Sequence, residues 1–207
     1  MTSEKKFIEE SVVKLNISKF MENSLSKAGF SRVEIQRTPV LTRITVYVLK
    51  PGRVIGRSGK TINDLTEQIS KTFDVKNPQI NVMEIDDPML EPMIVAKDIA
   101  YKIERSINAR KIMQRTLKDI LSRGALGAEI IISGKVAAKS ARKKKIRKRI
   151  GYIPKVGDVI KLVHEGHATA YPKHGAIGIK VRIVPPNTVF PDREIKKIEI
   201  PREISNA

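Results

Sequence analysis

The residues from Gly56 to Thr61, which read GRSGKT, have the types and spacing needed to hold a phosphate group. Glycines let the backbone approach an anion closely, and the N–H groups that open a following helix point toward it. Arg57 and Lys60 add positive charge, and Thr61 adds a hydroxyl. The stretch therefore predicts a phosphate site, either for a nucleotide or for a nucleic-acid backbone.

A nucleotide-binding P-loop has the pattern G-x-x-x-x-G-K-[ST] between a strand and a helix. Gly59, Lys60 and Thr61 fit the end of that pattern, but its first glycine falls at position 54, where the chain has Val54. Without that glycine the loop cannot wrap its backbone N–H groups around a β-phosphate. The P-loop interpretation is therefore disfavoured, while a corner between two helices that binds no ligand stays open as an alternative.

The flanking sequence fits an RNA-binding loop better. GRVIGRSGKTI resembles the signature of the KH module, in which a G-x-x-G loop between two short helices clamps four backbone nucleotides. The spacing alone is weak evidence, because two further G-x-x-G pairs, at 124/127 and 175/178, look like ordinary turns. The residues predicted to form the RNA-binding turn are Arg53, Gly56, Arg57, Ser58, Gly59 and Lys60.

The elements around this turn predict a type II KH domain. Apolar residues at helical spacing predict helices over 7–27, over 60–73 and from about 92 to 107. Alternation and β-branched residues predict strands over 32–37, 41–49 and 79–85. Two strands thus precede the turn and one follows it. Aromatic residues are only 4% of the chain, which disfavours folds that stack bases on exposed rings.

The net charge of +18 is distributed unevenly along the 207 residues. Residues 1–107 hold 17 Lys and Arg against 14 Asp and Glu, a net charge of +3, so residues 108–207 carry +15. Like charges repel within a compact fold, and nucleic acid is the commonest polyanion that compensates them. We therefore expect an α+β chain with a type II KH RNA-binding domain over 1–107 and a basic domain after it.

The second domain is predicted to be a mixed α/β domain over 108–184, followed by an extended, Pro-rich tail over 185–207 that depends on a partner for order. A helix is expected over 109–122, strands over 128–133, 158–164 and 177–184, and an irregular segment near 167–175. The helix has a basic face, with Lys111, Arg115 and Lys118, and an apolar face. Such a helix can pack on a sheet and face RNA.

A basic run, KVAAKSARKKKIRKR at 135–149, holds nine Lys and Arg and no acid. An ordinary solvated face would mix the two signs of charge, so the run predicts contact with phosphates. The residues predicted to make these phosphate contacts are Lys139, Arg142, Lys143, Lys144, Lys145, Arg147, Lys148 and Arg149.

Other kinds of chemistry have little support. The chain has no cysteine, and His164, His167 and His174 lack the spacing of a usual metal site. No Ser/His/Asp order or carboxylate pair stands out, so we expect no cofactor, no metal and no enzymatic activity. No apolar run reaches the roughly 20 residues of a membrane span, and the charged N-terminus lacks the pattern of a secretory signal. A cytoplasmic protein without a membrane partner is expected.

Two segments add specificity to the glycine turn, SRGALGAEIIISGK at 122–135 and HATAYPKHGAIGIKVRIV at 167–184. With the turn, they make the chain similar to the S-three family of small-subunit ribosomal proteins over about residues 7–184. The resemblance implies a structural ribosomal protein of translation that binds small-subunit rRNA in the head and lines the mRNA entry channel. It implies neighbouring head proteins as partners, with no homo-oligomer. The short basic form and the Pro-rich tail resemble archaeal members.

The resemblance also implies functional residues on the helix before GALGAE, whose basic side chains face incoming mRNA in the family and assist its unwinding. The matching positions are Arg110, Lys111 and Gln114, with Arg115 and Lys118 beside them. Gln114 departs from the bacterial pattern, which is basic there. An RNA-directed enzyme and a free KH regulator of mRNA remain alternatives. Micromolar, Mg-dependent ATP binding would favour a P-loop enzyme, and tight binding of short single strands by the isolated chain would favour the regulator.

Overall fold

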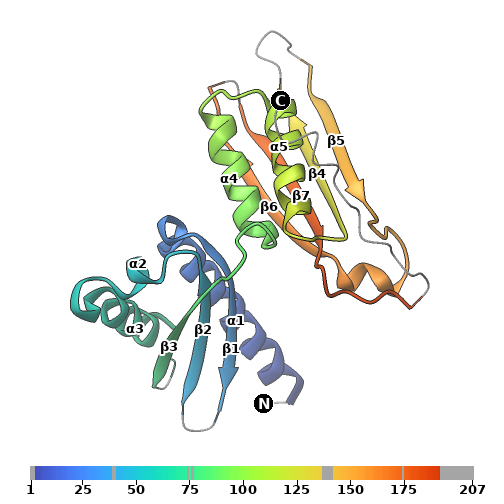
Figure 1. Ribbon diagram of the computed structural model, residues 1–207. Coiled ribbons are helices and arrows are strands. Elements are labelled where there is room, and N and C mark those ends of the chain that lie inside the picture. Colours follow the sequence, from blue (N-terminus) through green and yellow to red (C-terminus); the bar gives the residue numbers. More distant parts are fainter. Residues whose placement is uncertain are drawn as a thin grey trace. The chain divides into compact units, whose positions relative to one another are not determined.

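The computed structural model describes residues 3–38, 41–73, 75, 77–136, 142–173 and 175–191. Contacts divide the chain into two compact units, Met1–Asp86 and Asp87–Ala207. Each unit is a mixture of helices and strands, as the sequence predicts (Figure 1). Within the described ranges, no helix is both long and apolar enough to cross a membrane.

The first unit has the element order of a type II KH domain. Helix α1 (Ser3–Ser24) and the 3-10 turn η1 (Ser26–Ala28) lead into strands β1 (Phe30–Arg37) and β2 (Thr42–Val48). Helix α2 (Pro51–Ile55), the turn η2 (Arg57–Gly59), helix α3 (Lys60–Phe73) and strand β3 (Pro78–Glu84) follow. Strand β2 is central, antiparallel to β1 and parallel to β3. The predicted order of two strands before the glycine turn and one after it is confirmed.

The core of this unit lies between the sheet and its helices. Ile44, Val46 and Val48 alternate along β2 and are fully buried. Phe20 of α1 meets Phe73 of α3 edge to face, with 5.9 Å between the ring centroids. The later part of the apolar stripe of α1, with Met21 and Leu25 buried, therefore packs with α3 over the sheet and holds α3 and the turn before it in place. The earlier residues of that stripe, Ile8, Val12 and Leu15, are exposed.

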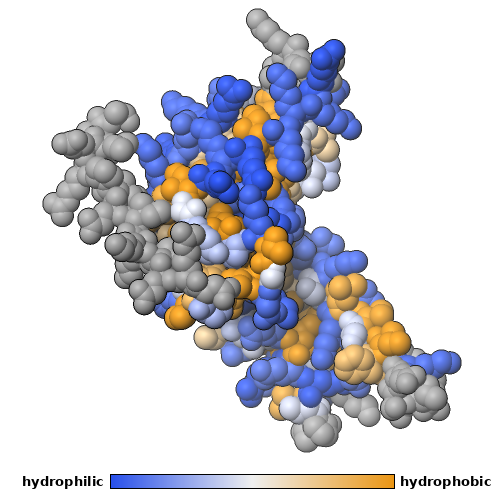
Figure 2. Space-filling model, turned by 90° about the vertical axis from the view of Figure 1, so that its right-hand side faces the viewer, coloured by the Kyte–Doolittle hydropathy of each residue, from blue (hydrophilic) through white to orange (hydrophobic). Residues whose placement is uncertain are grey.

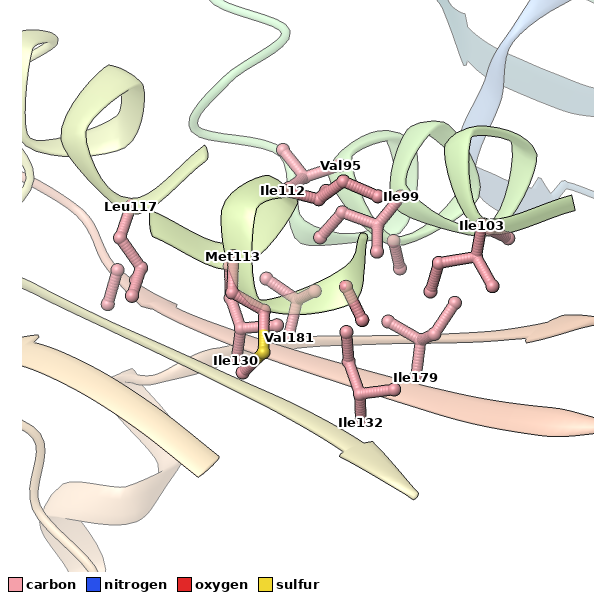
Figure 3. Close-up of a cluster of buried hydrophobic side chains, with 14 of the residues drawn as sticks. Val95, Ile99, Ile103, Ile112, Met113, Leu117, Ile130, Ile132, Ile179 and Val181 are labelled. Atoms are coloured by element: carbon pink, nitrogen blue, oxygen red, sulfur yellow. The ribbon is translucent and has the colours of Figure 1, made fainter. Parts of the chain in front are cut away.

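The second unit packs two helices on one face of a four-stranded sheet. Helices α4 (Pro92–Glu104) and α5 (Ala109–Ser122) precede strands β4 (Gly127–Gly134), β5 (Lys144–Gly151), β6 (His164–Ala170) and β7 (Ile177–Val184), with a 3-10 turn η3 (Asp158–Leu162) before β6. The strand order is β5-β4-β7-β6, and all neighbours are antiparallel. Figure 3 shows α4 and α5 directing Ile99, Ile103 and Met113 toward Ile130 and Val181 of the sheet.

Helix α4 corrects the predicted domain boundary. The boundary along the sequence falls between Asp86 and Asp87 and not between residues 107 and 108. Helix α4 belongs to the second unit because it packs against β6 and β7. Gly166 on β6 is the physical reason for this close fit. A Cβ atom there would lie 2.3 Å from the carbonyl carbon of Pro92 at the start of α4. Only glycine lets the helix approach the strand so closely.

The predicted strand over 158–164 is wrong, because residues 158–162 form η3 and the strand begins at His164. The irregular segment predicted near 167–175 is in part the rest of β6. Its helix-facing residues include Gly166, Ala168 and Ala170, which are small because α4 lies close. The strand therefore lacks the large alternating apolar residues by which strands are recognised.

Residues 185–191 do not form the extended tail that was predicted. The N–H group of Thr188 donates to the carbonyl of Pro185 over 3.3 Å, which closes a turn. Phe190 is buried in a small apolar cluster with Leu126 and Val184, and its ring lies 5.3 Å from that of Tyr152. This part of the tail packs on the second unit. Residues 192–207 lie outside the described residues.

Candidate nucleic-acid interface

The glycine turn joins α2 to α3, as the KH resemblance implies. Val54 is fully buried beneath it, which explains why an apolar residue stands at this position. The predicted RNA-binding side chains of Arg53, Arg57, Ser58 and Lys60 are exposed. The turn therefore presents cations to solvent at the start of the 14-residue helix α3, whose N-terminus favours an anion.

The two glycines of the turn have different structural roles. Gly56 has φ 73° and ψ −175°, a conformation that essentially only glycine adopts, and a Cβ there would lie 2.1 Å from Oγ1 of Thr61. Gly59 also has a positive φ, 75°, but the nearest atom to its Cβ position is Cγ2 of Ile62 at 4.0 Å. Gly56 thus shapes the turn, and Gly59 leaves open space for a phosphate to approach the backbone.

Helix α5 has the two faces predicted from its sequence. Asn108 caps the helix by accepting a hydrogen bond from the backbone N–H of Arg110 over 3.0 Å. The inner face buries Ile112, Met113 and Leu117. The five positions predicted to face mRNA, namely Arg110, Lys111, Gln114, Arg115 and Lys118, are all exposed. They form one polar face along the helix, with the neutral Gln114 between two pairs of cations.

The basic run becomes an edge strand, which the sequence analysis did not predict. In β5, Ile146, Lys148 and Ile150 are half-buried on the side of the helices, and Ile146 and Ile150 pack against the core. Lys145, Arg147 and Arg149 are exposed and belong to the opposite side of the sheet. We call this side, which α4 and α5 do not cover, the open face. Lys144 starts the strand, Arg142 and Lys143 precede it and are exposed, and Lys139 lies outside the described residues.

The open face contains charged residues that sequence analysis missed. The strand register places Lys180 and Arg182 of β7, Glu129 of β4 and Glu165 of β6 on the same side as Arg149. A signal was present in the sequence, because IGIKVRIV alternates apolar residues with Gly178, Lys180 and Arg182. In Figure 2, viewed from the side where β5 lies in Figure 1, hydrophilic residues cover much of the second unit, with apolar patches between them.

The two carboxylates of the open face are ion-paired with its cations. Glu129, with a side chain only 1% exposed, pairs with Nε of Arg147 and with Nη1 of Arg182, the latter at 3.5 Å. Glu165 pairs with Nζ of Lys180 at 2.8 Å and with Nε of Arg182 at 2.6 Å. Burial opposes ionisation of Glu165, but these two ion pairs outweigh it and lower its pKa. Glu165 is therefore ionised at neutral pH, and the ion pairs of both carboxylates hold the long cationic side chains in place.

His164 and His167, the two histidines in the described ranges, do not share a metal site. His164 and His167 lie on opposite faces of β6, and Nε2 of His167 is 3.6 Å from Oε2 of Glu165. His174 lies outside the described residues. In the part of the chain that the structure describes, no three His, Cys, Asp or Glu side chains form a group that could hold a metal ion.

The first unit has the element order and the glycine turn of a KH domain. The second unit has two exposed cationic surfaces. Together these features define an RNA-binding protein with a KH domain. A sequence model of the KH domain matches residues 3–90, and one described as "Ribosomal protein S3, C-terminal domain" matches residues 99–183. The chain belongs to the family of small ribosomal subunit protein uS3, as the sequence resemblance predicted.

Three relatives of that name show how far the similarity extends. The protein of Methanothermobacter thermautotrophicus is 40% identical over 191 residues, which cover 92% of this chain and 73% of the relative. That of Methanosphaera stadtmanae is 41% identical over 95% of this chain and 78% of the relative. That of Methanocaldococcus jannaschii is 38% identical over 94% of this chain and 93% of the relative. The similarity therefore spans both units.

Proposed function

We propose that this protein is a structural constituent of the small ribosomal subunit, where it binds rRNA in the head and lines the mRNA entry channel. The relatives named small ribosomal subunit protein uS3 support the ribosomal role. The observation that carries the proposal is the distribution of cations in the second unit. They form two separate exposed surfaces, the outer face of α5 and the open face of the sheet.

The open face is suited to folded rRNA. It is broad, and its five cations, Lys145, Arg147, Arg149, Lys180 and Arg182, exceed its two carboxylates. Because ion pairs hold several of these side chains in position, little conformational entropy is lost when phosphates bind. Such a surface favours a fixed array of phosphates, as a folded RNA provides. The glycine turn of the first unit adds a separate contact with an RNA backbone.

The outer face of α5 is suited to a single strand that moves past it. Its residues form a narrow row along one helix, and the cations Arg110, Lys111, Arg115 and Lys118 can attract phosphates without enclosing the strand. Neutral Gln114 weakens the hold on a strand at the centre of the row. Attraction of one strand of a structured mRNA to this row would assist its unwinding.

Reconstituted small subunits test this division between the two surfaces. The pair Lys145→Gln and Arg149→Gln should weaken co-sedimentation of the protein with subunits about tenfold or more, and reduce the salt dependence of binding by about one unit of slope per lost phosphate contact. The pair Lys111→Gln and Lys118→Gln, two exposed positions of the outer face of α5 that, unlike Arg110, do not line the cleft between the α4–α5 connection and the sheet, should leave co-sedimentation nearly unchanged but lower crosslinking to incoming mRNA. Failure of the wild-type protein to co-sediment in moderate salt would overturn the ribosomal role, and equal effects of both pairs would overturn the division.

A further inference from the structure

A cleft of about 540 Å³ opens in the second unit between the α4–α5 connection and the sheet. Its walls are mostly aliphatic and include Ile103, Ile107, Ile146 and Ile177. The chain turns at Ser106, which has a positive φ of 62°, and the next residue, Ile107, is 46% exposed although it lines the cleft. The volume lies within the range of pockets that bind small molecules, about 300–1,000 Å³.

The polar residues of the cleft favour an anionic ligand. Arg110, Lys135 and Lys144 line it, and among the described lining residues none is acidic. Ser106 and Asn108 add hydrogen-bonding groups. An apolar space bordered by three cations matches a molecule with a flat, weakly polar part and negative charge on either side of it. A nucleotide within an RNA strand has this composition, with a base between two phosphates.

The position of the cleft gives a second, independent reason for an RNA ligand. Arg110 belongs both to the cleft and to the outer face of α5, and Lys144 belongs both to the cleft and to the basic strand β5. Lys144 lies with Ile146 on the helix side of β5 and not on the open face, so the cleft adjoins the outer face of α5 and the start of the basic strand. An RNA chain bound to Arg110 and Lys144 would have its backbone held at the edge of the cleft.

We infer that this cleft is a base-binding pocket that takes one unpaired nucleotide of small-subunit rRNA. The base lies among Ile103, Ile107 and Ile146, and Arg110, Lys135 and Lys144 contact the flanking phosphates. The assignment rests on the proposed ribosomal function. It commits to rRNA because a pocket that encloses a base holds its strand in place, whereas mRNA must slide during translation.

Chemical probing of rRNA in reconstituted subunits tests the pocket. Ile107→Trp should fill it without changing charge, and the exposed position of Ile107 leaves the core intact. With the wild-type protein, one unpaired rRNA base should be protected from base-specific reagents. With Ile107→Trp, that base should become reactive, while protection of the sugar–phosphate backbone elsewhere stays the same, and affinity for the subunit should fall roughly 5- to 100-fold.

A matched control and a second variant keep the result interpretable. Val189→Trp adds the same ring at a position that is 84% exposed and does not line the cleft, so it should leave the base protected. If Ile107→Trp does not fold, the smaller Ile107→Phe should show the same change at lower amplitude.

The outcomes separate the pocket from the ribosomal function itself. Identical base protection with the wild-type protein and the Ile107 variants would overturn the pocket and leave the ribosomal role standing. Protection that appears only on bases of added mRNA would overturn the commitment to rRNA. Absence of any rRNA protection by the wild-type protein would overturn the proposed function and the pocket together.

Discussion

The two units of this chain use different physical means at their candidate RNA sites. The first unit holds 14 Lys and Arg against 10 Asp and Glu, a net charge of +4, whereas the second holds 26 against 12, a net charge of +14. In the first unit the candidate site is one turn, whose backbone conformation depends on Gly56 and Gly59. In the second it is a pair of surfaces defined by charge. The backbone conformation of the glycine turn defines the site in the first unit, and the positive charge of exposed side chains defines the surfaces in the second.

The two sheets show the same difference. On β1 and β2 of the first unit, Arg32 lies over the ring of Tyr47 at 4.3 Å and pairs with Glu34 at 3.7 Å, so the charges roughly balance. On the open face of the second unit the cations outnumber the carboxylates, and Glu129 and Glu165 organise them. In both sheets backbone N–H and C=O groups pair neighbouring strands, parallel or antiparallel, so the backbone of the sheet does not decide what a unit binds. The outward-facing residues of its strands do.

The largest expected effect comes from Gly166→Ala, which tests the close packing of α4 in the second unit. The added Cβ would meet backbone atoms of Pro92 and Met93 at 2.3–2.5 Å, and backbone relaxes at higher cost than a flexible side chain. We expect the second unit to lose about 3 kcal/mol of stability. Gly52→Ala in the first unit, where no atom lies within 4 Å, should change stability by less than about 1 kcal/mol. Calorimetry with hydrogen exchange of each unit measures both, and equal effects would contradict the predicted packing.

Glu129→Ala should have the next largest effect. The substitution removes a buried carboxylate from between Arg147 and Arg182, whose side chains are 42% and 25% exposed. Because water screens these partly exposed cations, we expect a loss of about 2 kcal/mol rather than the larger cost of an isolated buried charge. As a control, Glu67→Ala removes an exposed ion pair with Lys71 on α3 and should cause no measurable change in urea unfolding. A loss of stability in Glu67→Ala as large as that in Glu129→Ala would contradict the importance of burial for the ion pairs of Glu129.

Gly59→Asp tests whether the glycine turn contacts phosphate. The positive φ of 75° should cost about 1 kcal/mol, and there is space for the side chain, so the KH fold should survive. The new negative charge should lower RNA crosslinking to residues 53–60. Gly59→Asn has nearly the same shape and tolerates a positive φ but carries no charge, so its crosslinking yield should stay close to that of the wild type. Equal yields for the Asp and Asn variants would show that no phosphate approaches the turn.

The smallest expected effect is a loss of stability of the second unit at acidic pH. Ion pairs with Lys180 and Arg182 lower the pKa of Glu165 below its ordinary value of 4.5. A group with a lowered folded pKa contributes stability that is fully present above pH 4.5 and is lost as the pH falls through the folded pKa. The second unit should therefore lose this contribution only below pH 4.5, and Lys180→Met should move the pKa of Glu165 back toward 4.5 in an NMR titration.

High salt should change the pKa values of two ion-paired carboxylates, one in each unit, by different amounts. The hydrogen bond and charge of Lys71 lower the pKa of Glu67 in the first unit, where the carboxylate is exposed. At about 1 M salt, where charges are screened within about 3 Å, the pKa of Glu67 should return further toward 4.5 than that of Glu165. A larger return at Glu165 would mean that its partners do not hold it as the structure shows.

Much of the architecture was predictable because local patterns agreed with it. The strand–strand–turn–helix order of the KH domain, helix α3 at 60–73 and helix α5 at 109–122 follow from apolar periodicity and glycine positions. The basic face of α5 with Lys111, Arg115 and Lys118 follows in the same way, whereas Arg110 and Gln114 were assigned to the mRNA-facing set from the family resemblance. Strands β5 and β6 were not predicted. In β5 a run of cations obscures the alternation of apolar and polar residues, and in β6 the residues that face the helix are too small to show it.

The sequence by itself determined the class of this protein, because net charge, the glycine turn and the two family-specific segments are properties of neighbouring residues. Only the tertiary structure decided which charges act together. Antiparallel pairing brings residues 129, 147, 165, 180 and 182 onto one open face, and the α4–α5 connection meets the end of β5 to form the cleft. Pairing register and helix docking depend on contacts between residues far apart in the chain, and periodicity within a single segment carries no information about them.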